Sequence, residues 1–244
     1  MVRGDRGSLR AVLGSRSMVE PVTPSEGWGC LHLFCVVGPD ADRQAVLAAV
    51  KSCQEDDHQV IPFAVLGHKA DLGFMAIGPN LWRLQQFQTE LREAGLDFAD
   101  SYVSLTEVSE YSKGLPAETL EARLHPHLPP PGKKAICFYP MSKKREAGAN
   151  WFTLPFEQRK DLMYGHGKVG REFAGRILQL ITGSVGLDDW EWGVTLFAED
   201  PVDLKECVYR MRFDEGSAVY AEFGTFVTGL IGLPDEILDS VGLT

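Results

Sequence analysis

The same order of apolar and amphipathic segments occurs twice along this chain of 244 residues, and this repeat limits the fold more than any other feature. Each time, a short apolar run is followed by a stretch with helical spacing, two further apolar runs, a second helical stretch and a last apolar run. This β-α-β-β-α-β order is typical of a ferredoxin-like unit. Two such units can join their sheets, so the sequence predicts an α+β fold in which two ferredoxin-like units form a dimeric α+β barrel.

The expected elements follow from apolar runs and turn residues. Expected strands are 32–39, 58–67, 70–78 and 100–111 in the first unit, and 135–141, 177–187, 190–200 and 224–232 in the second. Expected helices are 42–56, 80–95, 154–175 and 201–223. Gly95 is placed to end the second helix, and Pro201 lies in the first turn of the fourth.

Proline-rich and polar stretches suggest where the units begin and end. We expect a disordered N-terminal tail (1–27), an N-terminal unit (28–112), a linker loop (113–133) and a C-terminal unit (134–235). The tail is rich in Arg and Ser but lacks the apolar segment of a secretory signal. A transit peptide and a true start at Met18 are the alternatives to a plain disordered tail.

Composition excludes several classes of function. Hydrophobic residues make up 44% of the chain and charged residues 24%, so a globular protein is expected. The net charge of −10 argues against nucleic acid and anionic membranes as partners. The five cysteines are odd in number and form no CxxC pair, which favours a reducing, cytoplasmic location and argues against a disulfide framework or structural zinc. No apolar run is long enough to predict a membrane-spanning helix.

A histidine between two glycines interrupts a predicted helix. In LMYGHGKVGREFAG (Leu162–Gly175), His166 lies between Gly165 and Gly167. A glycine in a helix interior costs about 1 kcal/mol relative to alanine. Without side chains at these positions, a large flat ligand can approach the backbone while the imidazole reaches its metal, and a neutral imidazole is a common axial ligand of haem iron. The alternative is a structural or solvated histidine in a bent or frayed helix.

A tyrosine at the end of an expected strand is followed by a basic cluster. In CFYPMSKKR, Tyr139 precedes Lys143, Lys144 and Arg145. A tyrosine beside cations can act as an acid, a base or a one-electron donor. The alternative is an aromatic core residue followed by a solvated turn.

Further basic residues are scattered over the second unit, namely Lys168, Arg171, Arg176, Arg210 and Arg212. The planar fork of arginine binds carboxylates in a bidentate manner. In an acidic protein, such a group near a metal ligand suggests an anionic ligand with carboxylate arms. Taken singly, most such residues are only helix-surface charges.

Four segments together resemble a known family. They are CFYPMSKKR, LMYGHGKVGREFAG, ITGSVGLDDWEWGVTLF and YRMRFDEGSAVYAEFGTFVTG. They are similar to the coproheme decarboxylases, or peroxide-dependent haem synthases, of the chlorite dismutase superfamily. The resemblance is dense from Lys134 to Leu230 and thinner over the first unit.

The resemblance implies a function in haem biosynthesis. Coproheme, the iron complex of coproporphyrin III, would lose the carboxyl groups of two propionates in sequence to give haem b, with hydrogen peroxide as the oxidant. The coproheme would be both substrate and redox centre. The resemblance also implies a homopentamer, with coproheme and hydrogen peroxide as partners and a transient contact with a ferrochelatase.

The resemblance assigns a role to individual residues. His166 matches the proximal iron ligand, Tyr139 the catalytic tyrosine, and Lys143 a lysine that assists at the second propionate. The matched cofactor-binding positions are Arg123, Met141, Arg171, Gln179, Arg212 and Ser217, where Gln179 corresponds to a distal glutamine and Arg123, Arg171, Arg212 and Ser217 to propionate contacts. The loop before Tyr139 carries about two extra residues relative to the family pattern, which weakens the match at Arg123. Tyr111 is a further candidate for a propionate contact.

Three other functions remain open at this stage. A chlorite dismutase would share the fold and the histidine but hold its oxyanion with a distal arginine, where this sequence has Gln179. A haem-retaining peroxidase and a non-catalytic haem carrier are the others. A simple carrier needs neither Tyr139 nor Lys143.

Overall fold

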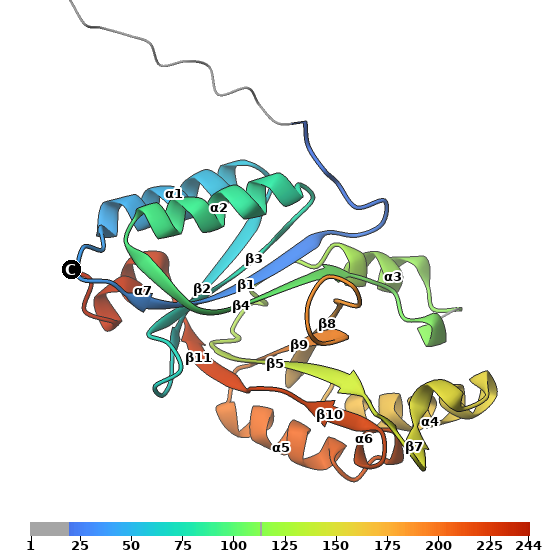
Figure 1. Ribbon diagram of the computed structural model, residues 1–244. Coiled ribbons are helices and arrows are strands. Elements are labelled where there is room, and N and C mark those ends of the chain that lie inside the picture. Colours follow the sequence, from blue (N-terminus) through green and yellow to red (C-terminus); the bar gives the residue numbers. More distant parts are fainter. Residues whose placement is uncertain (1–19, 113) are drawn as a thin grey trace, which may run out of the picture.

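The computed structural model describes residues 20–112 and 114–244. It confirms the predicted α+β class and the repeated order of elements (Figure 1). The first unit contains β1 (Gly29–Val37), α1 (Arg43–Glu55), β2 (Gln59–Val65), β3 (Leu72–Gly78), α2 (Leu81–Glu93) and β4 (Leu96–Thr106). The second contains β5 (Ala135–Lys143), α4 (Phe156–Arg171), β8 (Ile177–Gly183), β9 (Trp192–Ala198), α5 (Pro201–Met211) and β11 (Val227–Ile231).

Shorter elements depart from the sequence prediction. They are η1 (Glu110–Ser112), α3 (Ala117–Leu124), β6 (Arg145–Glu146), β7 (Ala149–Asn150), η2 (Trp151–Thr153), α6 (Glu215–Ala218), β10 (Ala221–Phe223) and α7 (Pro234–Ser240). The predicted linker loop 113–133 therefore contains a helix, α3, built from good helix formers directly after Pro116. The predicted helix 201–223 is wrong beyond Met211, because Asp214 caps a new short helix with its side chain.

Residues 20–28 contain no helix or strand, but Val22 already accepts a backbone hydrogen bond from Leu81 at the start of α2. Residues 1–19 of the predicted tail, including Met18, lie outside the described residues. No helix in the described part of the chain has the length and apolar character needed to cross a membrane.

Nine of the described strands form one antiparallel sheet that closes on itself, and β6 and β7 form a separate two-stranded sheet. The order of the larger sheet is β10-β5-β11-β2-β3-β1-β4-β8-β9, and β5 also pairs with β9. The last strand of each unit reaches the other unit, because β4 pairs with β8 and β11 pairs with β2. The interior is filled by side chains from both units, such as Phe34, Phe63 and Phe138. The structure thus has the two-unit barrel that the sequence predicts.

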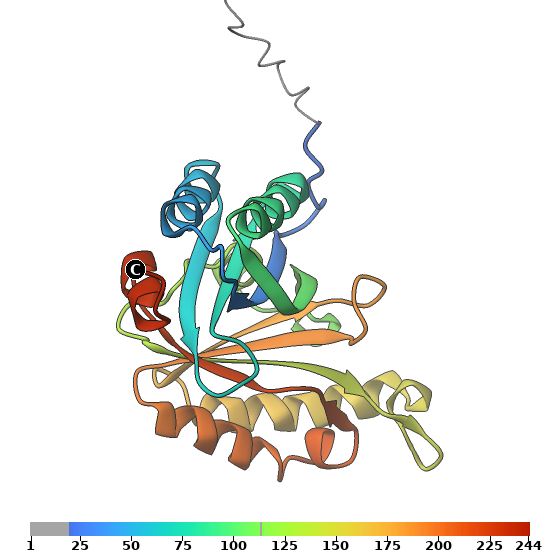
Figure 2. The same cartoon turned by 60° about the vertical axis from the view of Figure 1, so that its left-hand side comes forward.

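Helices cover the two halves of the barrel on opposite sides. Helices α1 and α2 lie over the first unit, and α4, α5 and α6 lie over the second (Figures 1 and 2). Alternation along β5 decides which side chains meet these helices: Cys137 and Tyr139 belong to the cluster that includes Leu204 of α5, whereas Ile136 and Phe138 point into the barrel.

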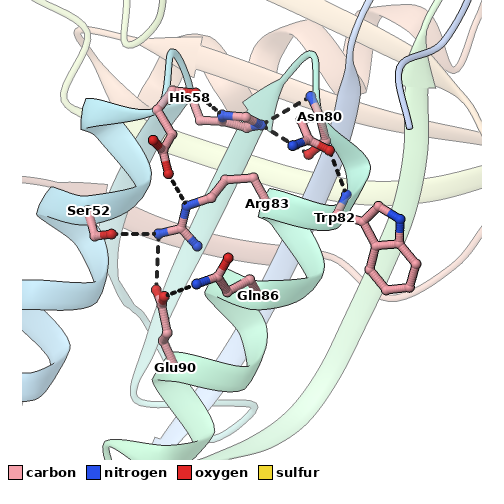
Figure 3. A network of polar contacts seen from close by, with 8 residues as sticks. Ser52, His58, Asn80, Trp82, Arg83, Gln86 and Glu90 are labelled. Carbon is pink, nitrogen blue, oxygen red and sulfur yellow. Dashed lines mark hydrogen bonds and ion pairs between the residues drawn. The ribbon is translucent and has the colours of Figure 1, made fainter. Parts of the chain in front are cut away.

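A buried arginine joins the two helices of the first unit (Figure 3). Arg83 of α2 is only 4% exposed. Its Nη2 donates to Ser52 Oγ of α1 at 3.2 Å and to Glu90 Oε2 at 3.0 Å, and its Nε lies 3.0 Å from Asp56 Oδ2. These contacts fix α1 against α2 and offset part of the cost of burying the guanidinium, whose Nε and Nη1 have no hydrogen-bond partner among the described residues.

Helix α7 belongs structurally to the first unit, although it follows the second in the chain. Ile237 and Leu238 are buried in the cluster beneath α1 and α2. Arg43 of α1 forms ion pairs with Asp235 at 3.1 Å and Asp239 at 2.7 Å. The predicted boundary at 235 falls inside this helix.

Candidate functional site

His166 is held by a carboxylate from a different helix. Its Nδ1 lies 2.9 Å from Asp214 Oδ2 and 3.3 Å from Ser217 Oγ. Burial alone would raise the pKa of Asp214, but the hydrogen bond and charge of His166, together with the Ser217 hydrogen bonds, lower it. An ionised Asp214 can accept a proton from Nδ1, and the imidazole tautomer with its hydrogen on Nδ1 has its lone pair on Nε2. Among the described residues, Nε2 has no hydrogen-bond partner. A carboxylate on the far nitrogen is the usual arrangement behind a metal-binding histidine.

The glycines that flank His166 are helical, and the fold itself does not require them. A Cβ on Gly165 would come no closer than 3.8 Å to any neighbour, Asp214 Oδ1, and one on Gly167 no closer than 3.6 Å, to Arg171 Nη1. Both are ordinary van der Waals contacts, so alanine would fit at either position. Packing within the chain therefore does not explain why Gly165 and Gly167 are glycines despite their low helix propensity. A ligand that approaches this surface of α4 would explain both.

Helix α4 leaves part of the second unit uncovered. It has no buried residue among its sixteen, although it has the same place in its unit as α1. On β8, Gln179 is exposed and Ile181 is 41% exposed. Both register with residues of β9 that face the helices, Leu196 and Val194, so both lie on the helix side of the sheet.

Tyr139, Met141 and Lys143 lie on one face of β5 because side chains alternate along a strand. Tyr139 is 7% exposed. Its ring stacks on Phe226 with centroids 4.4 Å apart and meets the edge of Phe223 at 5.6 Å. Burial raises the pKa of Tyr139 far above its ordinary value, so the phenol keeps its proton. The hydroxyl is therefore a source of a hydrogen atom and not a ready base.

Lys143 is also buried and is held from several sides. Its Nζ donates to the carbonyl of Gly216 at 2.8 Å and lies 4.3 Å from the ring centroid of Trp151. Its backbone N–H donates to Glu191 Oε2 at 2.8 Å. Burial lowers the pKa of Lys143 to about 8, against the opposing charges of Asp214 and Glu191. The amine can therefore hold or release a proton near neutral pH.

The short segment Asp214–Ser217 joins the two halves of the site. Asp214 and Ser217 contact His166, and Gly216 between them accepts the bond from Lys143. The structure thus brings together three predicted residues, His166, Lys143 and Ser217. The hydroxyl of Ser217 faces the imidazole instead of standing free.

A second group of predicted residues lies around η1. Arg123 of α3 donates to Ser112 Oγ at 2.6 Å. Tyr111 stacks on Phe156 of α4 with centroids 5.8 Å apart, and Arg159 of α4 lies 3.4 Å from Glu110. The hydroxyl of Tyr111 and Nε of Arg159 are buried without hydrogen-bond partners in the described part of the chain.

The hydroxyl of Tyr111 is available as a donor. Burial, and to a smaller extent the Glu110 carboxylate, raise the pKa of Tyr111 to about 12, with Arg159 and Trp151 opposing. Arginines bond both chain neighbours of Tyr111, Arg159 pairing with Glu110 and Arg123 donating to Ser112, so a protonated phenol in this setting suits a carboxylate.

Two predicted residues, Arg171 and Arg212, are exposed, and each contacts a tyrosine. Their guanidinium carbons lie 5.8 Å and 5.7 Å from the rings of Tyr164 and Tyr209, respectively. No hydrogen bond or ion pair joins either arginine to His166, Tyr139 or Lys143 within residues 20–112 and 114–244.

One cavity in the described part of the chain lies away from His166 and Lys143. A volume of about 410 Å³ opens at one end of the barrel, lined by Phe34, Tyr102, Phe138, Trp190 and Asp188 among others. Phe138 lies on the opposite face of β5 from Tyr139. The chemistry of His166 and Lys143, and not cavity size, therefore locates the candidate site.

Comparison with known proteins identifies the family. The sequence profile described as chlorite dismutase matches residues 41–232. The chain belongs to the chlorite dismutase family. A haem-binding protein from Thermus thermophilus superposes with a TM-score of 0.79 at 36% identity, over 92% of this chain and 99% of its own.

Members of the chlorite dismutase family with lower identity share the fold. A mutant chlorite dismutase from Candidatus Nitrospira defluvii gives a TM-score of 0.72 at 18% identity, over 89% of this chain and 97% of its own. The imidazole complex of the chlorite dismutase from that organism gives 0.71 at 19% identity, over 89% and 96%.

The sequence alone did not predict three residues that contact His166 or Lys143 in this structure. They are Asp214, Trp151 and Glu191. Asp214 is 48 residues from His166, and only its place at the start of a short D-E-G-S helix gives a signal, since aspartate is a preferred N-cap. Trp151 and Glu191 reach Lys143 from η2 and from the end of the β8–β9 connection, and no local pattern predicts either contact.

Proposed function

We propose that this protein binds coproheme through His166 and converts it to haem b, removing two propionate carboxyl groups with hydrogen peroxide. The observation that carries the proposal is the setting of His166. Its Nδ1 is held by Asp214, its Nε2 has no partner among the described residues, and it lies on a helix that buries no side chain. Membership of the chlorite dismutase family and the haem-binding relative from Thermus thermophilus support a haem-like ligand.

The residues present fit an iron porphyrin with carboxylate arms. Gly165 and Gly167 leave room along α4, and Gln179 and Ile181 offer a partly apolar surface on β8. The hydroxyl of Tyr111 and Nε of Arg159 have no hydrogen-bond partner among the described residues, and Arg123 bonds Ser112, the residue after Tyr111, so this region offers donors for a propionate. Met141, Arg171, Arg212 and Ser217 remain proposed contacts on the strength of the resemblance.

When bound, the iron and hydrogen peroxide supply the oxidising equivalents. For each propionate, the carbon–carboxyl bond breaks and a C–H bond is lost. One peroxide and one proton are consumed, and a vinyl group, carbon dioxide and two waters result. Tyr139 gives up its hydroxyl hydrogen and then takes a hydrogen atom from the propionate side chain, a role that its buried, protonated state allows. Lys143 binds the carboxylate of the second propionate and can exchange a proton near neutral pH.

The test separates binding from catalysis. Tyr139→Phe should bind coproheme with nearly native affinity but yield no haem b when peroxide is added, as followed by absorption and mass spectrometry. Lys143→Ala should instead accumulate the three-propionate product. A matched control is Tyr164→Phe, which alters a tyrosine that is 71% exposed on α4 and should make haem b normally.

The outcomes distinguish this proposal from its alternatives. Haem b formation at the native rate by Tyr139→Phe would rule out the mechanism. A native protein that binds the porphyrin and retains it unchanged after peroxide would instead be a peroxidase or a carrier. Rapid oxygen release from chlorite by the haem-loaded protein would favour chlorite dismutase activity. Under the proposal, a homopentamer and contact with a ferrochelatase are expected from the resemblance, and a cytoplasmic location is expected from the cysteine pattern.

A further inference from the structure

A buried tryptophan lies directly against the amine of Lys143. Trp151 is 3% exposed although the next residue, Phe152, is 44% exposed. The backbone N–H of Trp151 donates to the Lys144 carbonyl at 3.0 Å. The edge-to-face contact with Tyr220, with centroids 5.4 Å apart, fixes its ring. The indole therefore has one orientation, with a face 4.3 Å from Lys143 Nζ.

Lys143 meets two attractive groups in this position. The ring face of Trp151 attracts a cation through its quadrupole, most strongly where water is excluded. The carbonyl of Gly216, 2.8 Å away, accepts one of the three ammonium hydrogens. An aliphatic side chain could fill the volume of the indole equally well but could not attract the cation. An aromatic residue at position 151 therefore indicates an interaction with the Lys143 ammonium in addition to filling space.

We infer that Trp151 is a positioning residue for Lys143, whose ring holds the ammonium on the carbonyl of Gly216 and so directs it for the second decarboxylation. The inference deepens the proposed function and rests on it for the catalytic consequence. The geometric part stands on the protein alone. Because Gly216 lies between Asp214 and Ser217, the same contact ties the position of Lys143 to the segment that holds His166.

The first experiment uses the protein without porphyrin. Lysines are trace-labelled with acetic anhydride near neutral pH, and peptide mass spectrometry compares Lys143 with the exposed Lys205 of α5. In Trp151→Leu, labelling of Lys143 should rise about fivefold, since the cation–π attraction that holds the charged, unreactive form is lost. Trp151→Phe, which restores a ring face, should recover most of the protection. Trp82→Leu, at a tryptophan that is 44% exposed in the first unit, is the matched control and should change nothing.

Loss of packing is checked in the same samples. The thiol of Cys207, which is 4% exposed, must stay unreactive. If Trp151→Leu exposes it, Trp151→Met replaces that variant, because methionine adapts to irregular gaps, and the same criterion applies. Native-like labelling of Lys143 in a folded variant without the ring would overturn the inference.

The second experiment loads the protein with coproheme and adds peroxide. Trp151→Leu should raise the ratio of three-propionate product to haem b, and Trp151→Phe should bring that ratio back toward the native value. A native protein that makes no haem b while the labelling differences persist would remove the proposed function and leave the positioning role intact. An unchanged ratio in Trp151→Leu would remove the catalytic part of the inference.

Discussion

The two ferredoxin-like units share one order of elements, but their first helices differ in what they cover. Helix α1 buries four side chains, Val46, Ala49, Val50 and Cys53, whereas α4 buries none. The strand beneath α1 is largely buried, while β8 leaves Gln179 and Ile181 exposed toward the helix side. One unit is therefore a completed core and the other presents a surface that the chain itself does not fill.

Polar contacts follow the same division. In the first unit, Arg83 is 4% exposed and links α1 to α2. In the second, Arg210 of α5 pairs with Glu172 just past α4, and both side chains are about half exposed (48% and 46%). Exposed pairs contribute little to stability, so α4 and α5 are joined more weakly. In a fold with two repeated units, one unit can thus be well packed and stabilise the structure, while the other leaves a surface exposed for a ligand.

The strongest test of the comparison uses one histidine from each unit. His166→Ala should weaken binding of ferric porphyrin by more than about 100-fold. Losing the residue that hydrogen-bonds a metal-binding histidine typically costs about 10–100-fold in affinity, and losing the histidine itself should cost more. An absorbance titration measures this. Binding within tenfold of native would contradict the role of His166.

His58 of the first unit is the matched control. It is 4% exposed and its ring contacts the carbonyls of Asp56 at 2.6 Å and Asn80 at 3.1 Å. His58→Ala should leave porphyrin binding unchanged but lower the free energy of unfolding by about 1–3 kcal/mol, because buried partners lose hydrogen bonds.

A smaller effect should follow from the same substitution in the equivalent helices. Val50→Ala removes a side chain that is 1% exposed and should cost about 2 kcal/mol of unfolding free energy, measured in urea. Val169→Ala on α4 should cost less than about 1 kcal/mol in the protein without porphyrin. Equal losses would show that α4 is as well packed as α1.

The buried amine of the second unit should make stability depend on pH. Burial lowers the pKa of Lys143 from 10.5 to about 8, so the folded protein binds fewer protons than the unfolded chain between these values. Stability from this group therefore rises with pH across that window. Lys143→Met should stabilise by about 1 kcal/mol near pH 7 and by less above pH ~10, as thermal unfolding at both values would measure. A gain that grows with pH would contradict the sign.

The smallest expected effect concerns the glycines beside His166. Gly165→Ala should raise the free energy of unfolding without porphyrin by about 0.5–1 kcal/mol, since alanine fits the helix and has the better propensity. The same change should weaken porphyrin binding, because a methyl group then occupies the approach to α4. A variant that gains stability and binds normally would mean that no ligand needs these glycines.

Much of the fold could be predicted because it depends on local periodicity. Apolar spacing located both units, but the strand predicted for 135–141 ended before Lys143, which is the last residue of β5 and shares a face with Tyr139. The helix predicted for 201–223 was wrong beyond Met211. The Asp214 side chain accepts a hydrogen bond from the backbone N–H of Ser217 and so begins a separate short helix, and this contact is visible only in the structure. The helix α7 was missed because its stability comes from contacts with α1, far away in sequence.

The sequence predicted the main reactive side chains of the site but not the contacts that orient them. The glycines pointed to His166, and the strand end pointed to Tyr139 and Lys143. The contacts that orient these groups, from Asp214 and Trp151, join positions that no spacing rule connects. They depend on where α6 and η2 pack against α4 and β5, and that packing depends on the tertiary structure of the barrel.

Helix α7 has a consequence for how the protein is made. Ile237, Leu238 and Leu243 complete the hydrophobic cluster of the first unit, yet they are synthesised after the whole second unit. On a ribosome, residues 29–106 emerge first but lack these side chains until residue 243 has been added. The first unit can therefore complete its interior only after the whole second unit has been synthesised.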